Sequence, residues 1–320
     1  MTRVVTFGEL LLRLSPPGEE RLLASPQFVT YFGGAEANVA VALNHFGVPC
    51  DYVTRLPENP LGDAALAALQ REGVGTQWIT RGAERLGLYF VEPGADLRAM
   101  RVVYDRAGSA FAGLDADAID WQSILADATW FHSTGITPAL GAGPARALAA
   151  AIVQARASRQ PVSLDLNYRA ALWHGRDPRP IVEPLARSAD LVIANAAAVQ
   201  AMLGIDGADS SLAERVARDL GCPYVAITQR ESIGARAQRW SAVLWDAAAA
   251  RCFASTQQEV VVVDRVGGGD CFSAALIARL LDGAPAAEAL EFAVRASALK
   301  VTQPGDFSRL SVADVLAWQR

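Results

Sequence analysis

Lysine is almost absent from this chain of 320 residues, because Lys300 is the only one and arginine supplies the rest of the positive charge. The chain also lacks a Gly-Lys-Ser or Gly-Lys-Thr tripeptide, which excludes a P-loop phosphate site. Any cationic contact with a phosphate or carboxylate must therefore come from arginine or Lys300, with backbone N–H groups as the other donors. Arginine suits planar, bidentate recognition of carboxylates.

Cysteine and histidine are also scarce, and neither is clustered. The four cysteines are scattered, with no C-x-x-C pair and no histidine close by, so we expect neither a zinc site nor a secreted disulfide framework. The three histidines form no spaced cluster, and we assign them no metal and no nucleophilic role. The cysteines are Cys50, Cys222, Cys252 and Cys271, and the histidines are His45, His132 and His174.

Long apolar runs and a strong positive charge are absent as well. No stretch approaches the roughly 20 apolar residues of a membrane span, and the N-terminus does not have the pattern of a signal peptide. We therefore expect a cytoplasmic protein without a membrane partner. A net charge of −5 argues against a nucleic-acid partner. With 52% hydrophobic and 20% charged residues, the chain has the composition of a well-cored protein.

Short apolar runs recur along the chain, and most are followed by a longer helical pattern. The expected strands are Val4–Phe7, Tyr52–Thr54, Thr129–His132, Val162–Leu166, Leu191–Ala194, Val225–Thr228 and Val260–Val263. Helical patterns include Ala64–Arg71, Gly143–Ala157 and Leu212–Leu220. This alternation predicts an α/β domain whose mostly parallel sheet carries helices on both faces.

Two segments interrupt the alternation, residues 11–32 and residues 86–110. The second reads as a hairpin of Leu88–Glu92 and Met100–Arg106 around the turn Pro93-Gly94-Ala95-Asp96. We interpret both as a small β lid, while residues 1–10, 33–85 and 111–320 form the main domain. Ligands of open parallel sheets bind beyond the carboxyl ends of the strands, where this chain places Asn195, Thr228 and Arg230.

The most informative stretch is Gly267-Gly268-Gly269-Asp270, which follows the valine run and precedes an apolar helical pattern, Phe272–Leu281. Glycines before a helix leave N–H groups open to an anion, and the helix dipole adds positive charge. A carboxylate at such a site can serve as the base for an attacking alcohol. The alternative is a capped turn, since aspartate is a common N-cap. A dinucleotide fingerprint would need glycine where Phe272 stands.

Three further patterns contain candidate binding residues. Gly33 and Gly34 open a helix that carries Asn38, and Gly47 is expected to end that helix; the alternative is a tight connection in which Asn38 only caps. Tyr104 and Arg106 lie on one face of a strand, and Tyr89 lies on the partner strand, so this face suits a sugar that carries a carboxylate. The alternative is an amphipathic hairpin whose arginine points into solvent. Strand alternation places Asp165, Asn167 and Arg169 on one side, and the alternative is an internal Asp–Arg pair at a strand end.

Taken together, these patterns make the chain similar to ribokinase-like (PfkB) carbohydrate kinases over essentially its whole length. The motifs that carry the resemblance are Gly33-Gly34, Asp165 to Arg169, and Asp264 followed by Gly267 to Asp270. Three stretches resemble the 2-keto-3-deoxygluconate kinase branch, namely Arg13 to Gly18, Tyr104 to Ala110 and Asp165 to Trp173.

The resemblance implies a three-layer αβα domain with a β lid, through which such proteins often form a homodimer or a higher homo-oligomer. It also implies ATP, Mg²⁺ and, for some members, a monovalent cation. Asp270 would be the base for the 6-hydroxyl of the keto-acid, and the N–H groups of Gly267, Gly268 and Gly269 would form the anion hole. The implied substrate contacts are Gly33, Gly34, Asn38, Tyr89, Tyr104, Arg106, Asn167, Arg169 and Asp270. The implied nucleotide contacts are Asn195, Thr228, Arg230, Gly267, Gly269 and Ser297.

Two departures from the family pattern concern the metal and the glycine motif. The family often has a glutamate three residues after the asparagine at Asn195, where this chain has Ala198, so no direct metal ligand is assigned and Asn195 would act at most through water. The threonine common after Asp264 is Arg265. The alternatives are another sugar kinase such as a fructokinase, or a non-catalytic sensor of a sugar acid or nucleotide. The late position and spacing of the glycines argue against a Rossmann oxidoreductase.

Overall fold

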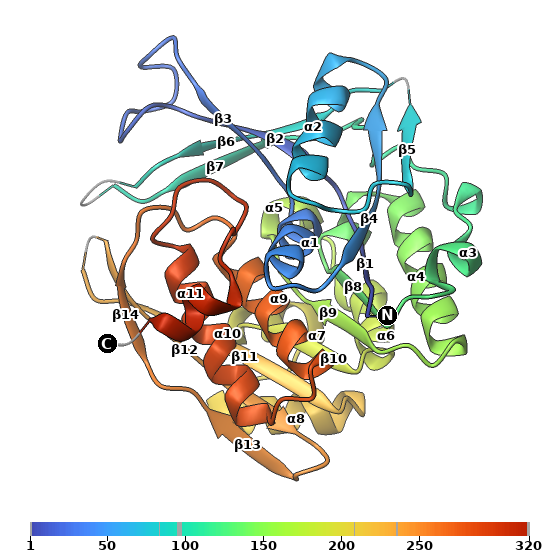
Figure 1. Cartoon of the computed structure of the whole chain (residues 1–320), viewed down its shortest axis with the longest axis vertical. Helices are drawn as coiled ribbons and strands as arrows, with labels where there is room; N and C mark the ends of the chain where they lie inside the picture. Colours follow the sequence, from blue (N-terminus) through green and yellow to red (C-terminus); the bar gives the residue numbers. More distant parts are fainter. Residues whose placement is uncertain (1, 83, 95–97, 208, 235, 319–320) are drawn as a thin grey trace.

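A ten-stranded, mostly parallel sheet forms the centre of the molecule (Figure 1). The computed structural model describes residues 2–82, 84–94, 98–207, 209–234 and 236–318. The strands run in the order β13-β12-β11-β10-β9-β8-β1-β4-β5, with β14 paired to β12. Their bounds are β1 Val4–Phe7, β4 Cys50–Pro57, β5 Ile79–Gly82, β8 Trp130–Thr134, β9 Val162–Asp165, β10 Leu191–Ala194, β11 Tyr224–Ser232, β12 Ala237–Asp246, β13 Arg251–Ala254 and β14 Gln258–Val261.

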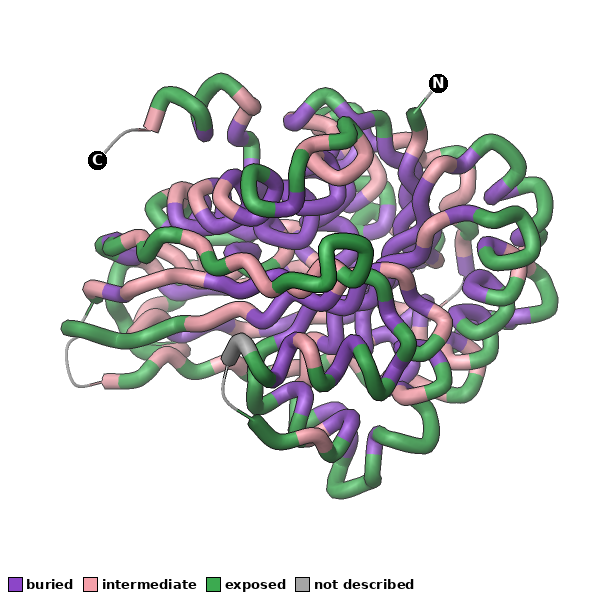
Figure 2. The backbone as a smooth tube through the Cα atoms, turned by 90° about the horizontal axis from the view of Figure 1, so that it is seen from below, coloured by how far each residue is buried: buried purple, intermediate pink, exposed green. Residues whose placement is uncertain are grey.

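Helices cover both faces of this sheet, as the alternating pattern predicts. On one face lie α1 (Ala35–His45), α9 (Gly268–Leu281) and α10 (Ala286–Lys300), around a core that includes Leu43, Leu276 and Leu290. On the other face lie α4 (Ala142–Ala157), α6 (Arg179–Arg187), α7 (Ala196–Leu203) and α8 (Asp209–Leu220), around a second core. Buried backbone accordingly runs through the middle of the molecule in Figure 2. The predicted αβα fold is confirmed.

The remaining helices are short or lie at the periphery of the molecule. They are α2 (Pro60–Arg71), α3 (Trp121–Leu125), α5 (Ala170–Trp173), α11 (Val312–Ala317) and the 3₁₀ turns η1 (Ala116–Ala118) and η2 (Thr137–Leu140). Asn59 caps α2 by accepting from the backbone N–H groups of Leu61 and Gly62. Gly47 follows the end of α1 with a φ of 82°, as its expected role requires. No helix in the described ranges is both long and apolar enough to cross a membrane.

A second sheet of four strands lies apart from the main one, in the order β3-β2-β6-β7 (Figure 1, top). It consists of β2 (Leu11–Ser15), β3 (Val29–Gly33), β6 (Gly87–Glu92) and β7 (Arg101–Asp105). Almost all of it falls in the two segments in which we expected a β lid, and β6 and β7 form the expected antiparallel pair. Ala95 and Asp96 of the predicted hairpin turn lie outside the described residues.

The prediction of a buried strand at Val260–Val263 is wrong in its bounds and its burial. β14 spans Gln258–Val261 and pairs antiparallel with β12 away from the main strand path, and Val261 and Val263 are 61% and 63% exposed. An edge hairpin buries only one side of its strand, so the valines alternate between core and solvent. β12, which pairs with β14, was not predicted, since its run Ala237–Asp246 mixes polar and apolar residues.

Candidate active site

A cavity of about 640 Å³ opens at the carboxyl edge of the main sheet and reaches the second sheet. Most of the predicted site residues line it: Gly34, Asn38, Tyr89, Tyr104, Arg106, Asn167, Arg169, Asn195, Thr228, Arg230, Gly267, Gly269 and Asp270. Gly33, Gly268 and Ser297 do not line the cavity. The sequence thus indicated the edge of the sheet at which this cavity opens, and tertiary structure decides which residues line it.

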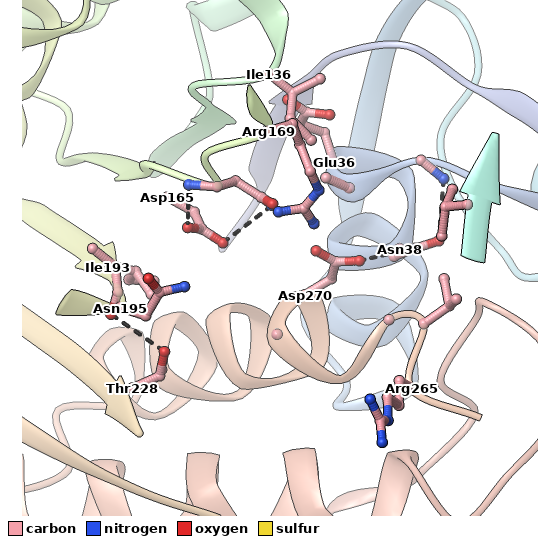
Figure 3. Close-up of a pocket in the computed structure, with 18 of the residues that line it drawn as sticks. Glu36, Asn38, Ile136, Asp165, Arg169, Ile193, Asn195, Thr228, Arg265 and Asp270 are labelled. Atoms are coloured by element: carbon pink, nitrogen blue, oxygen red, sulfur yellow. Dashed lines mark hydrogen bonds between the residues drawn. The ribbon is translucent and has the colours of Figure 1, made fainter. Parts of the chain in front are cut away.

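Asp270 lies in the first turn of α9 and faces the cavity (Figure 3). It is not the N-cap, since that position belongs to Gly267, whose φ of 80° lies in the left-handed region. Its Oδ2 instead accepts a hydrogen bond of 2.6 Å from Asn38 Nδ2. The capped-turn interpretation of Asp270 is therefore wrong, and Asn38 does more than cap its own helix.

The environment of Asp270 shifts its pKa upward. Burial raises its pKa, and this effect outweighs the hydrogen bond from Asn38 and the positive charges of Arg169 and Lys300. Asp165, at the end of β9, faces the same space (Figure 3), and burial together with the negative charge of Asp270 raises its pKa to about 7. Two carboxyl groups with raised pKa values in one cavity are typical of a site that moves protons.

Glu36 is a third carboxyl group at this cavity, and the sequence analysis missed it. It lies on α1 and is buried, which raises its pKa. Its Oε1 accepts from Thr134 N at 3.1 Å, from Thr134 Oγ1 at 2.7 Å and from Thr137 Oγ1 at 2.9 Å. Gly8 leaves the space for it, since a Cβ there would overlap the Glu36 side chain. An acidic residue two positions before Asn38 was the available signal, but such residues usually only complement the helix dipole.

Residues of α10 and of the segment that follows it pack closely against the glycine turn before Asp270. A Cβ on Gly267 would overlap the backbone oxygen of Asp306, and one on Gly268 would lie 2.7 Å from Val301 Cγ1. Ser297 Oγ donates to Gly268 O at 2.8 Å, so this predicted nucleotide contact supports the turn from underneath. Gly33 leaves room for the Asp306 side chain in the same way. Close approach of other groups therefore favours glycine at Gly33, Gly267 and Gly268, and Gly267 also has a left-handed conformation, whereas a Cβ on Gly269 would meet nothing within 4 Å.

The second sheet contributes an aromatic and cationic wall. Tyr89 and Tyr104 pair across β6 and β7, and their rings stack with centroids 6.0 Å apart. Tyr89 Oη donates to Asp306, and the Arg106 guanidinium lies over Tyr104, 5.5 Å from the ring centroid. Arg106 also donates from Nε to Glu9 Oε2 at 2.7 Å and forms an ion pair with this buried carboxylate. Part of its charge is thus already neutralised within the protein.

Arg169 and Asn167 reach the cavity by a route that strand alternation did not predict. β9 ends at Asp165, Asn167 adopts a φ of 41°, and Arg169 is the N-cap residue of α5. Asn167 donates its backbone N–H to Asp165 Oδ1 at 2.9 Å, which fixes the turn. Arg169 makes no ion pair within 4 Å with another described residue, although its charge lowers the pKa of both Asp165 and Asp270. Its guanidinium can therefore receive a carboxylate.

Arg230 and Arg265 add further positive charge to the cavity. Arg230 lies on β11, and its pKa is lowered by burial and by the nearby positive charges of Arg265 and Arg169. Arg265 also lines the cavity but was not among the predicted contacts. Thr228 Oγ1 donates to Ala194 O at 3.2 Å (Figure 3). Guanidinium groups that repel one another in a cavity are stabilised by a polyanion such as a triphosphate.

The residues present do not fit a metal centre held by the protein. Among the described residues, no group of three histidine, cysteine or acidic side chains could hold a metal ion. Asn195 caps α7, and its Oδ1 already accepts from Ala198 N at 2.9 Å. Ala198, where the family often has an acid, is buried and does not line the cavity. A Mg²⁺ ion bound to ATP phosphates would have to keep most of its phosphate and water ligands.

The cavity lining also includes residues that no sequence pattern singled out as ligand contacts. They are Glu9, Leu11, Ala35, Glu36, Met100, Val102, Ile136, Ile193, Ala194, Ala197, Gln229, Trp240, Arg265 and Val266. Many are apolar, and they come from elements that lie far apart in the sequence. The whole arrangement places buried carboxyl groups, backbone N–H groups at a helix N-terminus and several guanidinium groups around one space, which suits phosphoryl transfer to an alcohol.

Comparison with known proteins agrees with this chemistry. The model of the pfkB family of carbohydrate kinases matches residues 1–311. A 2-dehydro-3-deoxygalactonokinase from Haloferax volcanii is 34% identical over 95% of this chain and 92% of its own length. A 2-dehydro-3-deoxygluconokinase from Thermoproteus tenax is 30% identical over 96% and 90%. The crystal structure of a 2-dehydro-3-deoxygluconokinase from Thermotoga maritima is 42% identical, with a TM-score of 0.95 over 98% of this chain and 97% of that one.

Proposed function

Since the chain belongs to the pfkB family of carbohydrate kinases, we propose that it uses ATP to phosphorylate 2-dehydro-3-deoxygluconate, also called 2-keto-3-deoxygluconate, at its 6-hydroxyl. The observation that carries the proposal is the position of Asp270, at the N-terminus of α9, beside the glycine turn and hydrogen-bonded to Asn38. The similarity to the Thermotoga maritima and Thermoproteus tenax proteins supports the choice of sugar acid.

In the proposed reaction, ionised Asp270 takes the proton of the 6-hydroxyl while that oxygen attacks the terminal phosphorus of ATP. A new phosphorus–oxygen bond forms, the bond to the bridging oxygen breaks, and ADP leaves with those electrons. The N–H groups of Gly267 to Gly269 and the positive end of α9 stabilise the charge on the transferred group. Mg²⁺ would arrive with ATP and help to neutralise the phosphates. We assign no step to it, because the described residues do not provide a metal site.

Substrate and nucleotide would occupy opposite sides of the cavity. Arg169 can bind the carboxylate of the sugar acid, with Tyr104 and Arg106 of the second sheet beside the sugar. Arg230 and Arg265 would face the phosphates, where a bound polyanion relieves their mutual repulsion. This division brings the 6-hydroxyl and the terminal phosphate together at Asp270.

A second candidate substrate is the C4 epimer, 2-dehydro-3-deoxygalactonate, which the similarity to the Haloferax volcanii protein favours. Both acids present the same carboxylate and the same terminal hydroxyl, so the same residues could act on either. Fructose, the substrate of a fructokinase, has no carboxylate for Arg169 to bind. Turnover of the two acids and of fructose, measured as ADP release at saturating ATP and Mg²⁺, separates these functions. Preference for fructose would overturn the sugar-acid proposal.

The role of Asp270 is tested by Asp270→Asn, with Asp282→Asn as a matched control at the exposed far end of α9. We expect Asp270→Asn to lower kcat by about 100- to 10,000-fold, the usual contribution of a general base. Asp282→Asn should keep wild-type turnover. Ligand binding without ADP release by the wild type would instead indicate a non-catalytic sensor, and near wild-type kcat in Asp270→Asn would remove the assigned base.

We also propose that the second sheet pairs two copies of this chain. One face of this sheet supports the proposal, because the strand register places Leu12, Leu14, Phe32, Phe90 and Val103 on it, and Val103 is 45% exposed. Apolar residues gathered on one side of a thin sheet are typical of an interface between subunits. Light scattering that gives the mass of a single chain at micromolar concentration would contradict the proposal.

A further inference from the structure

The only lysine of the chain lies buried directly beneath the glycine turn. Lys300 is the last residue of α10 and is 0% exposed. Its ammonium donates to Val266 O at 2.9 Å and to Gly305 O at 2.7 Å. Its Cε lies 3.1 Å from the place that a Cβ on Gly267 would occupy. Burying an ammonium group costs free energy, so packing alone does not explain why a lysine occupies this position.

Asp264 holds the same two residues through their other backbone groups. Its Oδ1 accepts from Val266 N at 3.0 Å, and its Oδ2 accepts from Gly305 N at 3.0 Å. Lys300 and Asp264 therefore bind both the carbonyls and the N–H groups of Val266 and Gly305. We call these two charged side chains the Lys300–Asp264 clamp. Arg13 on β2 also donates to Asp264 Oδ2, at 2.7 Å, which ties the clamp to the second sheet.

The clamp acts on the segment whose N–H groups would bind the transferred phosphoryl group. Val266 directly precedes Gly267, so a fixed Val266 carbonyl also sets the direction of the Gly267 N–H, which belongs to the same planar peptide group. An ammonium held by two backbone carbonyls also resembles a monovalent cation in a protein, whose water is replaced by such oxygens. Lys300 is fully buried and does not line the cavity, so a nucleotide bound there would not touch its ammonium group.

We propose that Lys300 is a built-in cation that positions the glycine turn, so that this kinase works without an added monovalent cation. The inference rests on the proposed function, in which the glycine turn is the anion hole. Lys300 touches neither substrate nor ATP in this scheme and is therefore a positioning residue. A monovalent cation, which the family resemblance allowed for, would have no need to bind at the two carbonyls that Lys300 already occupies.

The first experiment uses the unmodified protein. Its turnover is measured at constant ionic strength with potassium, sodium or choline as the monovalent cation, and with the Mg²⁺ concentration fixed. We expect the three values of kcat to agree within about twofold. Activity that is lost in choline and restored by potassium would show that an external cation is needed and would overturn the proposal.

The second experiment removes the ammonium and returns a cation from solution. In Lys300→Ala, kcat should fall at least tenfold, with a smaller change in KM, and potassium or ammonium ions should restore part of it. Tetramethylammonium, which is too large for the space, should not. Lys300→Met keeps the length of the side chain without the charge, and we expect low kcat without rescue. Equal rescue by all cations, or wild-type kcat in Lys300→Met, would contradict a positioning charge.

Thermal unfolding gives a readout that does not depend on the substrate. The Tm of Lys300→Ala should rise when potassium replaces choline, whereas the wild-type Tm should not change. Leu290→Ala is the matched control, because it empties a buried position in the same helix and should lower the Tm without any response to potassium. If the wild type shows no kinase activity with any acceptor, the proposed function fails. A potassium-specific shift in Lys300→Ala alone would still support the clamp, and its absence would overturn it.

Discussion

At the scale of single residues, the function of a side chain depends on its partners. Asp270 follows three glycines, a context in which aspartate usually caps a helix. In the structure Gly267 takes the cap position, and Asp270 accepts from Asn38, 232 positions away in sequence. Sequence patterns suggested both residues as candidates, but only the approach of α1 to α9 identifies them as partners.

The two arginines expected to bind the substrate carboxylate also differ in their partners. Arg106 is paired with buried Glu9, whereas Arg169 makes no ion pair within 4 Å with another described side chain. We predict that Arg169→Gln raises the KM for the sugar acid about 10- to 100-fold, since a charged hydrogen bond is worth about 1.5–3 kcal/mol. Its KM for fructose, if fructose is a substrate, should change little. Steady-state kinetics with both acceptors measure this difference.

Arg106→Gln serves as the comparison and should behave differently. It leaves the Glu9 carboxylate buried without its partner, which typically costs about 3–5 kcal/mol of stability. Urea unfolding should therefore show a large loss for Arg106→Gln and almost none for Arg169→Gln. The same KM change in both variants, with equal stability, would mean that both arginines bind the carboxylate.

At the scale of elements, the turn that begins α9 leaves no room for a side chain at Gly267. We predict that Gly267→Ala lowers both the Tm and kcat. Alanine would be strained in the left-handed conformation of this position, and its Cβ would overlap the backbone oxygen of Asp306. Gly283, just beyond the other end of α9, has a similar φ of 73° but open space around it. Gly283→Ala should cost only about 1–2 kcal/mol, the usual cost of the left-handed conformation, and keep kcat.

Circular dichroism melts and turnover of the two glycine variants decide this prediction. Equal losses of Tm would show that backbone conformation alone explains the cost at Gly267. The valine run Val260–Val263 was predicted to be a buried strand, and both its bounds and its burial were wrong. A run of valines fits either a buried central strand or a half-exposed edge strand, and only the pairing with β12 separates the two.

At the scale of the whole molecule, the buried carboxyl groups of the cavity make stability depend on pH. Burial raises the pKa of Asp165 to about 7, against about 3.9 in an unfolded chain. Between these values the folded protein binds more protons than the unfolded one, so this group's contribution to the free energy of unfolding falls as the pH rises. The contribution is fully present below about pH 4 and is lost as the pH passes 7.

Asp165→Asn removes this contribution and serves as the test. We predict that the free energy of unfolding of the wild type, minus that of Asp165→Asn, decreases by at least about 1 kcal/mol between pH 5 and pH 8, since one pKa unit corresponds to about 1.4 kcal/mol. Urea unfolding at several pH values measures the difference. A constant difference across this range would show that Asp165 is already ionised at pH 5 in the folded protein.

The sequence by itself determined the αβα architecture, the carboxyl edge at which the cavity opens and about half of the residues that line it. These follow from periodicity and from residue types that lie next to one another in the chain, which local physical chemistry can interpret. Only the tertiary structure decided which charges are free and which are paired. It paired Arg106 with Glu9, made Glu36 part of the cavity and placed Lys300 under the glycine turn. Burial and electrostatic pairing depend on segments far apart in sequence, and no local pattern contains that information.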